Sequence, residues 1–170
     1  MNPKAKEYIA KLQLIRHPEG GYFKEIYRSR EYYEAEHLPG RYDNKRAFST
    51  SIYFLLEGTQ ISTLHKLKSD EIWHFYDGSA IVLYIFYESG KPDTKYLGSD
   101  LNKNESFQIT IPQGSWFGAE LKDKKSFGLI GCTVAPGFDF ADFEIGDREY
   151  LLKFYPEYSE IIKKMTKFKA

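Results

Sequence analysis

The segment GTQISTLHKLKSDEIWHFYDG, residues 58 to 78, decides how the rest of the chain is interpreted. Glycines bound it, and a polar Ser69-Asp70 step lies in its middle. Apolar residues on both sides of that step predict two strands, 60 to 67 and 71 to 76, joined by a turn. The hairpin carries three side chains that could exchange protons or bind a metal ion, namely His65, Glu71 and His74.

The composition predicts a single, mostly β domain. A chain of 170 residues is the size of about one domain. Aromatic residues make up 17% of it, and such residues suit the pleated surface of a sheet. Lys and Arg together number 24, as do Asp and Glu, so the formal net charge is zero. This balance excludes a nucleic-acid-binding protein that relies on a basic surface.

The same sequence predicts a soluble cytoplasmic protein. No apolar run approaches the roughly 18 residues of a membrane span, and the first residues lack the apolar core of a signal peptide. Cys132 is the single cysteine, which excludes an intrachain disulfide and a cysteine-based zinc site.

The order of patterns predicts a barrel flanked by short helices. Asn2 and Pro3 suit the start of a helix over residues 3 to 14. Roughly nine short strands, spaced about 8 to 12 residues apart, then predict a sandwich or barrel over about 20 to 146, with a jelly roll fitting best. Polar residues 30 to 47 predict a long exposed loop near a binding mouth. Two helices are expected within 147 to 168.

The spacing of the central hairpin resembles a known motif. His65-Lys66-Leu67 follows Gly58 after six residues, Glu71 comes three residues later, and Gly78 six residues after that. This is similar to the first motif of the cupin superfamily, with one extra residue and with leucine in place of the second histidine. The second cupin motif is matched at Pro112-Gln113-Gly114, but Phe117 and Leu121 occupy its histidine and asparagine positions.

More specifically, the chain resembles cupin family 5, whose members are mostly uncharacterised. The resemblance is carried by residues 17 to 29, 49 to 56, 69 to 78, 97 to 101, 111 to 121 and 131 to 144. It implies a single-domain double-stranded β-helix, or jelly roll, and a homodimer. It also implies a relation in fold to the deoxysugar 3,5-epimerases. Because one fold supports many functions, the resemblance predicts the fold much better than the activity.

The resemblance also raises the question of a metal ion. Metal-binding cupins use histidines and a glutamate at the positions that are His65, Leu67, Glu71 and Phe117 here. Two protein ligands are fewer than a catalytic ion usually has, so no metal is favoured. Strand alternation places Ile61, Thr63, His65 and Leu67 on one face, and Glu71, Trp73 and Phe75 on the interior face of the next strand. His74 then points away, unless a bulge makes it a third ligand.

Acid–base chemistry without a metal is the favoured alternative. A carboxylate near an imidazole can tune its pKa, so His65 and Glu71 are the candidate catalytic residues for moving a proton next to a carbonyl group. In the related epimerases a His–Asp dyad works with a tyrosine acid. Here the carboxylate could also come from Asp139 or Asp142, and the acid could be Tyr22, Tyr53 or Tyr84.

Further side chains are candidates for binding a small molecule. Trp73 and Trp116 could stack on a sugar, and Arg28 and Arg46 could bind a carboxylate or phosphate. The expected ligand is a carbohydrate or nucleotide-sugar, with no nucleic-acid partner, no membrane partner and no required cofactor. Three functions stay open from sequence: a metal-independent epimerase or isomerase, a non-catalytic ligand-binding cupin, and an enzyme that depends on a divalent metal.

Overall fold

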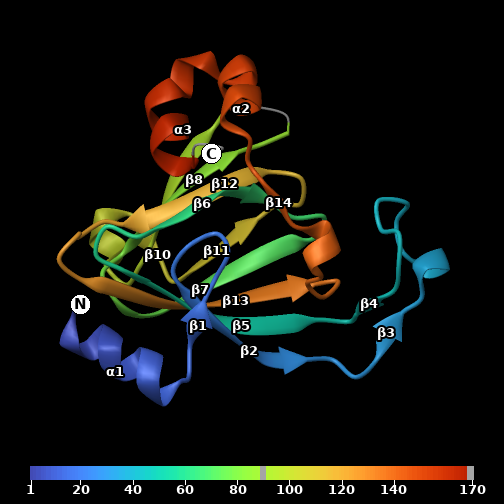
Figure 1. Ribbon diagram of the computed structural model, residues 1–170, viewed down its shortest axis with the longest axis horizontal. Coiled ribbons are helices and arrows are strands. Elements are labelled where there is room, and N and C mark those ends of the chain that lie inside the picture. The colour runs from blue at the N-terminus through green and yellow to red at the C-terminus, as the bar shows by residue number, and fades with distance from the viewer. Residues whose placement is uncertain (89–90, 168–170) are drawn as a thin grey trace.

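A computed structural model describes residues 1 to 88 and 91 to 167. Its main feature is a pair of six-stranded sheets (Figure 1). The first sheet contains, in spatial order, β1 (Ile15–Arg16), β2 (Tyr22–Arg28), β5 (Thr50–Glu57), β13 (Phe127–Ala135), β7 (Asp70–Gly78) and β11 (Gln108–Ile111). The second contains β10 (Glu105–Ser106), β9 (Asp93–Leu97), β8 (Ile81–Phe86), β12 (Trp116–Leu121), β6 (Ile61–Lys66) and β14 (Glu144–Ile145).

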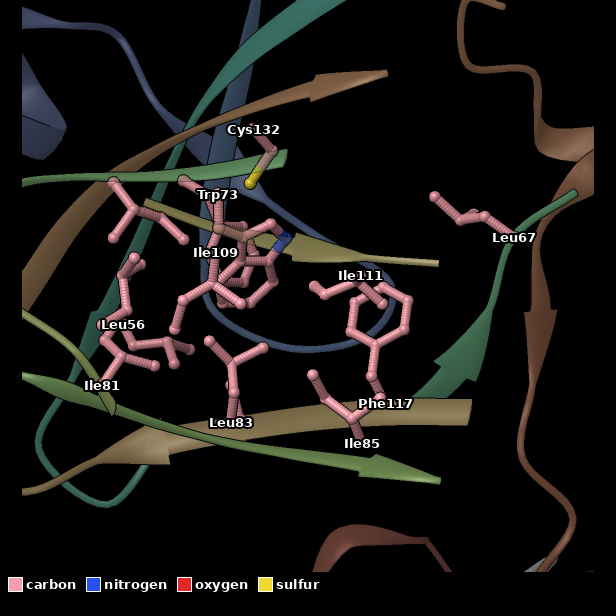
Figure 2. Packing of buried hydrophobic residues seen from close by; sticks show 14 of the residues in the cluster. Leu56, Leu67, Trp73, Ile81, Leu83, Ile85, Ile109, Ile111, Phe117 and Cys132 are labelled. Atoms are coloured by element: carbon pink, nitrogen blue, oxygen red, sulfur yellow. The ribbon is translucent and has the colours of Figure 1, made fainter. Parts of the chain in front are cut away.

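This arrangement is the jelly roll that the sequence predicts. Strand pairing is antiparallel except between β9 and β10. The interior alternates along the strands, so that residues two apart in β7 and β8 face the core between the sheets. Figure 2 shows this core, with Trp73 among aliphatic side chains of both sheets and Phe117 beside Ile85 and Ile111.

Short helices lie at both ends of the chain, as predicted. Helix α1 (Pro3–Lys11) begins where the sequence indicates, because the Asn2 side chain accepts hydrogen bonds from the backbone N–H groups of Lys4 and Ala5. It ends three residues earlier than expected. Helix α2 (Arg148–Phe154) is capped by Asp147, and α3 (Ser159–Met165) follows a 3₁₀ turn, η4 (Pro156–Tyr158). Among residues 1–88 and 91–167, no helix is long and apolar enough to cross a membrane.

The segment from 30 to 47 is more ordered than the predicted exposed loop. It contains β3 (Tyr32–Tyr33), the 3₁₀ turn η1 (Ala35–His37) and β4 (Arg46–Ala47), and β3 pairs with β4 (Figure 1). Polar composition correctly indicated exposure near its middle. It gave no sign of the long-range contacts at the end of the segment, where Arg46 is buried.

A buried ion pair fixes that end of the segment. The Arg46 guanidinium donates two hydrogen bonds of 2.6 Å to the carboxylate of Asp142, which lies in the 3₁₀ turn η3 (Phe140–Asp142). It also donates to the backbone carbonyl oxygens of Asn44 and Lys45 at 2.8 and 2.9 Å. The pair therefore ties β4 to the segment between β13 and β14.

We expect Asp142→Asn to lower the free energy of unfolding by about 3 to 5 kcal/mol, because it leaves the buried Arg46 charge without its counter-charge. The control is Glu144→Gln, which removes the exposed partner of Lys66 and should cost no more than about 1 kcal/mol. Urea unfolding of both variants measures the difference. Equal losses in the two variants would contradict the structural role assigned to the buried pair.

Candidate functional site

A cavity of about 250 Å³ opens at one end of the first sheet. Four neighbouring strands of that sheet line it, together with β6 of the second sheet, the turn before β2 and the segment before β14. The first sheet contributes Phe23, Glu25, Arg28, Thr50, Ile52, Phe54, Glu71, Trp73, Cys132 and Val134. The other segments contribute His17, Glu19, His65, Leu67, Phe138, Asp139, Phe140 and Phe143.

Strand alternation places the polar groups of β7 in this cavity. Glu71 and Trp73 are two residues apart, share the interior face and line the cavity, as predicted. His74 lies on the opposite face, where its Nε2 is 3.2 Å from the hydroxyl of Thr133. The register of β7 against β13 does shift, but only beyond Phe75, so it does not turn His74 towards Glu71.

The predicted face of β6 is wrong for part of the strand, because a bulge interrupts the alternation. His65 pairs with Phe117 and Ser62 with Ala119, so three steps along β6 match two along β12. Phe117 and Ala119 share one face of β12, and the bulge therefore brings Ser62 and His65 to the same side. Ile61, expected on the His65 face, packs instead with Leu64 beneath the C-terminal helices.

The turn at residues 17 to 21 brings a glutamate to this face of β6. A backbone N–H to O bond of 3.1 Å from Gly20 to His17 closes the turn. Gly20 has a φ of +117°, and a Cβ built there would lie 2.1 Å from the carbonyl oxygen of Ile61, so a side chain has no room. The close approach buries Glu19 against β6, where the backbone N–H and hydroxyl of Thr63 both donate to the Glu19 carbonyl oxygen at 3.0 Å.

Glu19, rather than Glu71, is the direct partner of His65. The Nε2 atom of His65 lies 3.1 Å from Glu19 Oε2, and its Nδ1 lies 2.7 Å from the carbonyl oxygen of Thr63. Since a carbonyl oxygen only accepts, Nδ1 carries a proton and donates it. Nε2 and the Glu19 carboxyl then share a single proton. The Ser62 hydroxyl completes the network by donating to Glu19 Oε1 at 2.8 Å.

Burial favours the neutral form of this network. It raises the pKa of the Glu19 carboxyl, although His17 and the Ser62 hydrogen bond oppose the rise. It lowers the pKa of His65, with Glu71 and the Thr63 carbonyl opposing. A protonated Glu19 that donates to a neutral His65 satisfies both directions. Both ring nitrogens of His65 are then engaged, so neither is free to accept a proton from a ligand.

Glu71 is the ionisable group that this network leaves unsatisfied. Its Oε2 and the Nε1 of Trp73 are buried and have no hydrogen-bond partner of normal geometry among the described residues. Burial raises the pKa of Glu71 to about 7; a positive charge on His65 would oppose that rise, and a negative charge on Glu19 would add to it. The Trp73 indole and the Cys132 thiol are close enough to oppose it as well. Glu71 is therefore poised to gain or lose a proton near neutral pH.

The mouth of the cavity is aromatic and carries an ion pair between Arg28 and Glu25. Arg28 donates two hydrogen bonds to Glu25, at 3.0 and 2.7 Å, and a third to the carbonyl oxygen of Phe138 at 3.1 Å. Asp139 lines the mouth and caps η3 through the backbone N–H of Ala141. The rings of Phe138, Phe140 and Phe143 pack edge to face around it.

Several residues proposed from the sequence lie outside the cavity. Asp142 is committed to Arg46, and the Tyr84 hydroxyl donates to Glu120. The others pack elsewhere: Tyr22 and Tyr53 against α1, Trp116 against α3, and His74 on the outer face of β7. Of the twelve candidate site residues named from the sequence, the cavity brings together His65, Glu71, Arg28, Trp73 and Asp139.

His17 and Glu19 are the site residues that the sequence analysis missed. The signal was local: two ionisable residues, two positions apart, directly before a Gly-Gly pair. By itself this pattern predicts a turn, and the structure has a turn there. Because Gly20 lets this turn lie close against β6, the turn also places the Glu19 side chain on that strand. No local pattern in the sequence indicates this contact.

The cavity does not fit the metal ion that other cupins hold. Leu67 and Phe117 stand at two ligand positions; Phe117 packs on His65 with ring centroids 4.0 Å apart, and Leu67 lies at the end of β6 (Figure 2). His65, the histidine at a cupin ligand position, has both ring nitrogens engaged in hydrogen bonds. Within residues 1–88 and 91–167, no three His, Cys, Asp or Glu side chains are arranged to hold a metal ion.

Comparison with known proteins gives relatives that match this chain over most of their length. The uncharacterized protein YML079W of Saccharomyces cerevisiae is 34% identical over 81% of this chain and 72% of its own. Protein SO0799 of Shewanella oneidensis has a TM-score of 0.87 and 34% identity, covering 97% of this chain and 98% of its own. A hypothetical protein from Leishmania major has a TM-score of 0.86 and 32% identity, covering 96% and 99%.

A more distant similarity extends to a larger enzyme. Oxalate decarboxylase from Bacillus subtilis has a TM-score of 0.55 and 16% identity, over 88% of this chain and 36% of that one. At that identity the match shows a shared fold alone. The model of the family Cupin_5, described as cupin superfamily (DUF985), matches residues 6 to 146. Together with the jelly-roll sheets and the two relatives of full length, this match shows that the chain belongs to the Cupin_5 family of the cupin superfamily.

Proposed function

We propose that this protein binds a small carbonyl compound of the carbohydrate or nucleotide-sugar class and moves a proton on it, as an isomerase or epimerase does. The observation that carries the proposal is Glu71: a carboxyl with a buried, unpaired oxygen and a pKa of about 7, on the wall of a cavity. Removal of a proton from the carbon next to a carbonyl group needs such a base.

The size of the cavity supports a small reacting unit. About 250 Å³ lies just below the common range for ligand pockets, roughly 300 to 1,000 Å³, and suits a single sugar ring. A nucleotide attached to that ring would extend out of the mouth. The aromatic rings there, Phe138, Phe140 and Phe143, offer surfaces for the faces of such a substituent.

His65 has a supporting role in this proposal. The Thr63 carbonyl and Glu19 hold its ring in the cavity wall, and any proton that it gained would lower the pKa of Glu71. His65 is therefore a positioning residue rather than the base. This differs from the sequence-based hypothesis, in which a His65–Glu71 pair removes the proton.

We also propose a homodimer. The unpaired edge of β2 supports it, because β1 pairs with Tyr22 and Phe23 and no described strand covers the same edge at 24 to 28. Exposed apolar side chains near this edge add to the argument: Ile15, Ile26, Tyr27, Tyr32, Tyr33 and Phe48.

The catalytic proposal is tested by hydrogen–deuterium exchange in D₂O with free keto-sugars and nucleotide-bound 4-keto-sugars. We expect ¹H NMR to show loss of the proton next to the carbonyl group, and expect Glu71→Gln to slow it at least about 100-fold, a typical contribution of a general base. Glu144→Gln, outside the cavity, is the control. Ligands that raise the melting temperature without exchanging would instead identify a non-catalytic binding protein.

The pH dependence gives an independent prediction. Glu71 must be ionised to accept a proton, so the exchange rate at limiting substrate should rise about tenfold per pH unit below 7 and level off above it. The rate measured from pH 5.5 to 8.5 gives the midpoint. A rate that falls as pH rises through 7 would show that a protonated group, not the Glu71 carboxylate, starts the reaction.

The dimer is tested by light scattering at micromolar protein concentration, where we expect twice the mass of the chain. Ile26→Lys should shift the mass towards the monomer, because it places a charge in the predicted interface. A monomer in the wild-type protein would refute the proposal.

A further inference from the structure

The imidazole of His17 lines the cavity and has no role in the proton transfer proposed above. Its backbone is fixed by the turn, through the bond from His17 N–H to the Gly21 carbonyl oxygen at 3.2 Å. Its ring is packed edge-on by three phenylalanines, with centroid distances of 4.5 Å to Phe23, 6.0 Å to Phe54 and 6.1 Å to Phe143. The ring is therefore held in one orientation on the cavity wall.

The turn also determines which ring nitrogen carries the proton. The backbone N–H of Glu19 donates to Nδ1 of His17 at 3.3 Å, so Nδ1 acts as the acceptor. A neutral imidazole has one donor and one acceptor, which leaves the proton on Nε2. No side chain or backbone group of the described residues forms a hydrogen bond with this Nε2. Its N–H is available to a ligand.

The surroundings keep the ring neutral at pH 7. Burial lowers the pKa of His17, the nearby Glu19 opposes this, and His65 adds to it. Glu19 comes from the same turn as His17, and His65 comes from β6. A neutral imidazole N–H can polarise a carbonyl group by donating a hydrogen bond to its oxygen.

We infer that His17 carries its proton on Nε2 and donates it in a hydrogen bond to the carbonyl oxygen of the ligand. The inference rests on the proposed function. Glu71 takes the proton from the neighbouring carbon, the C–H electron pair forms a carbon–carbon double bond, and the carbonyl π pair moves to the oxygen. His17 stabilises that negative oxygen. The Glu71 carboxyl exchanges its proton with solvent water, and return of a proton from Glu71 to carbon restores the carbonyl, so the step needs no reactant other than water.

Cyclohexanone tests this directly, since it offers a carbonyl group on a six-membered ring and exchangeable protons beside it. The ring nitrogens of the chain's four histidines are followed by ¹⁵N NMR at pH 7, with sequence-specific assignment of the wild-type protein. We expect an unprotonated Nδ1 and a protonated Nε2 in His17, and a shift of the Nε2–H signal when the ketone binds. An imidazolium, a proton on Nδ1, or no response of His17 to the ketone would overturn the inference.

The same samples separate this inference from the proposed function. A His17 shift without deuterium exchange supports the hydrogen bond and counts against proton transfer, whereas exchange with an unmoved His17 does the reverse. We expect His17→Phe to slow exchange at least about 100-fold and to weaken ketone binding by only about two- to tenfold. His37→Phe, on an exposed turn, should change neither. Unaltered exchange in a folded His17→Phe variant would overturn the role of His17.

Discussion

The contact between Glu19 and His65 is the constraint on which the site depends. It joins a turn at the start of the first sheet to the middle of a strand in the second, with more than forty residues between the two. A carboxyl group buried at such a place is tolerated only when its hydrogen bonds are complete. Ser62 and His65 complete them, and the bulge in β6 lets both do so from one side. Thr63 binds the backbone carbonyl oxygen of the same glutamate. The bulge, the glycine turn and the buried carboxyl are therefore parts of one arrangement.

This network divides the cavity into two chemical parts. On one side, Glu19 and His65 share a proton and have few unsatisfied hydrogen-bonding positions left. On the other side, Glu71 has a buried oxygen without a partner and a pKa of about 7. Satisfied buried networks stabilise one conformation, whereas unsatisfied groups are where a ligand gains most from binding. The sequence suggests that His65 and Glu71 act as a catalytic pair. The division instead makes His65 a supporting residue and leaves Glu71 as the proposed reacting group.

The sequence predicted the parts of the fold that local patterns encode. The two strands of the central hairpin, the helix start at Asn2, and the interior position of Glu71 and Trp73 all follow from short-range rules. Two features of the site could not be predicted from local sequence patterns. The bulge in β6 breaks the period of two with no glycine or proline to mark it, and the place of Glu19 depends on a distant strand. Trp116 was misleading as a ligand-binding candidate because helices cover its face of β12, so both faces of that strand are buried.

The residues at the cupin ligand positions bear on the high pKa of Glu71. A bound divalent cation would hold a neighbouring carboxylate in its ionised form. With Leu67 and Phe117 at two ligand positions, those side chains supply neither a ligand nor a counter-charge, and burial raises the pKa of Glu71 instead. A group whose charge would have been fixed by a metal then becomes able to exchange protons near neutral pH. The same substitutions that argue against a metal-dependent cupin are therefore what make acid–base chemistry available at this position.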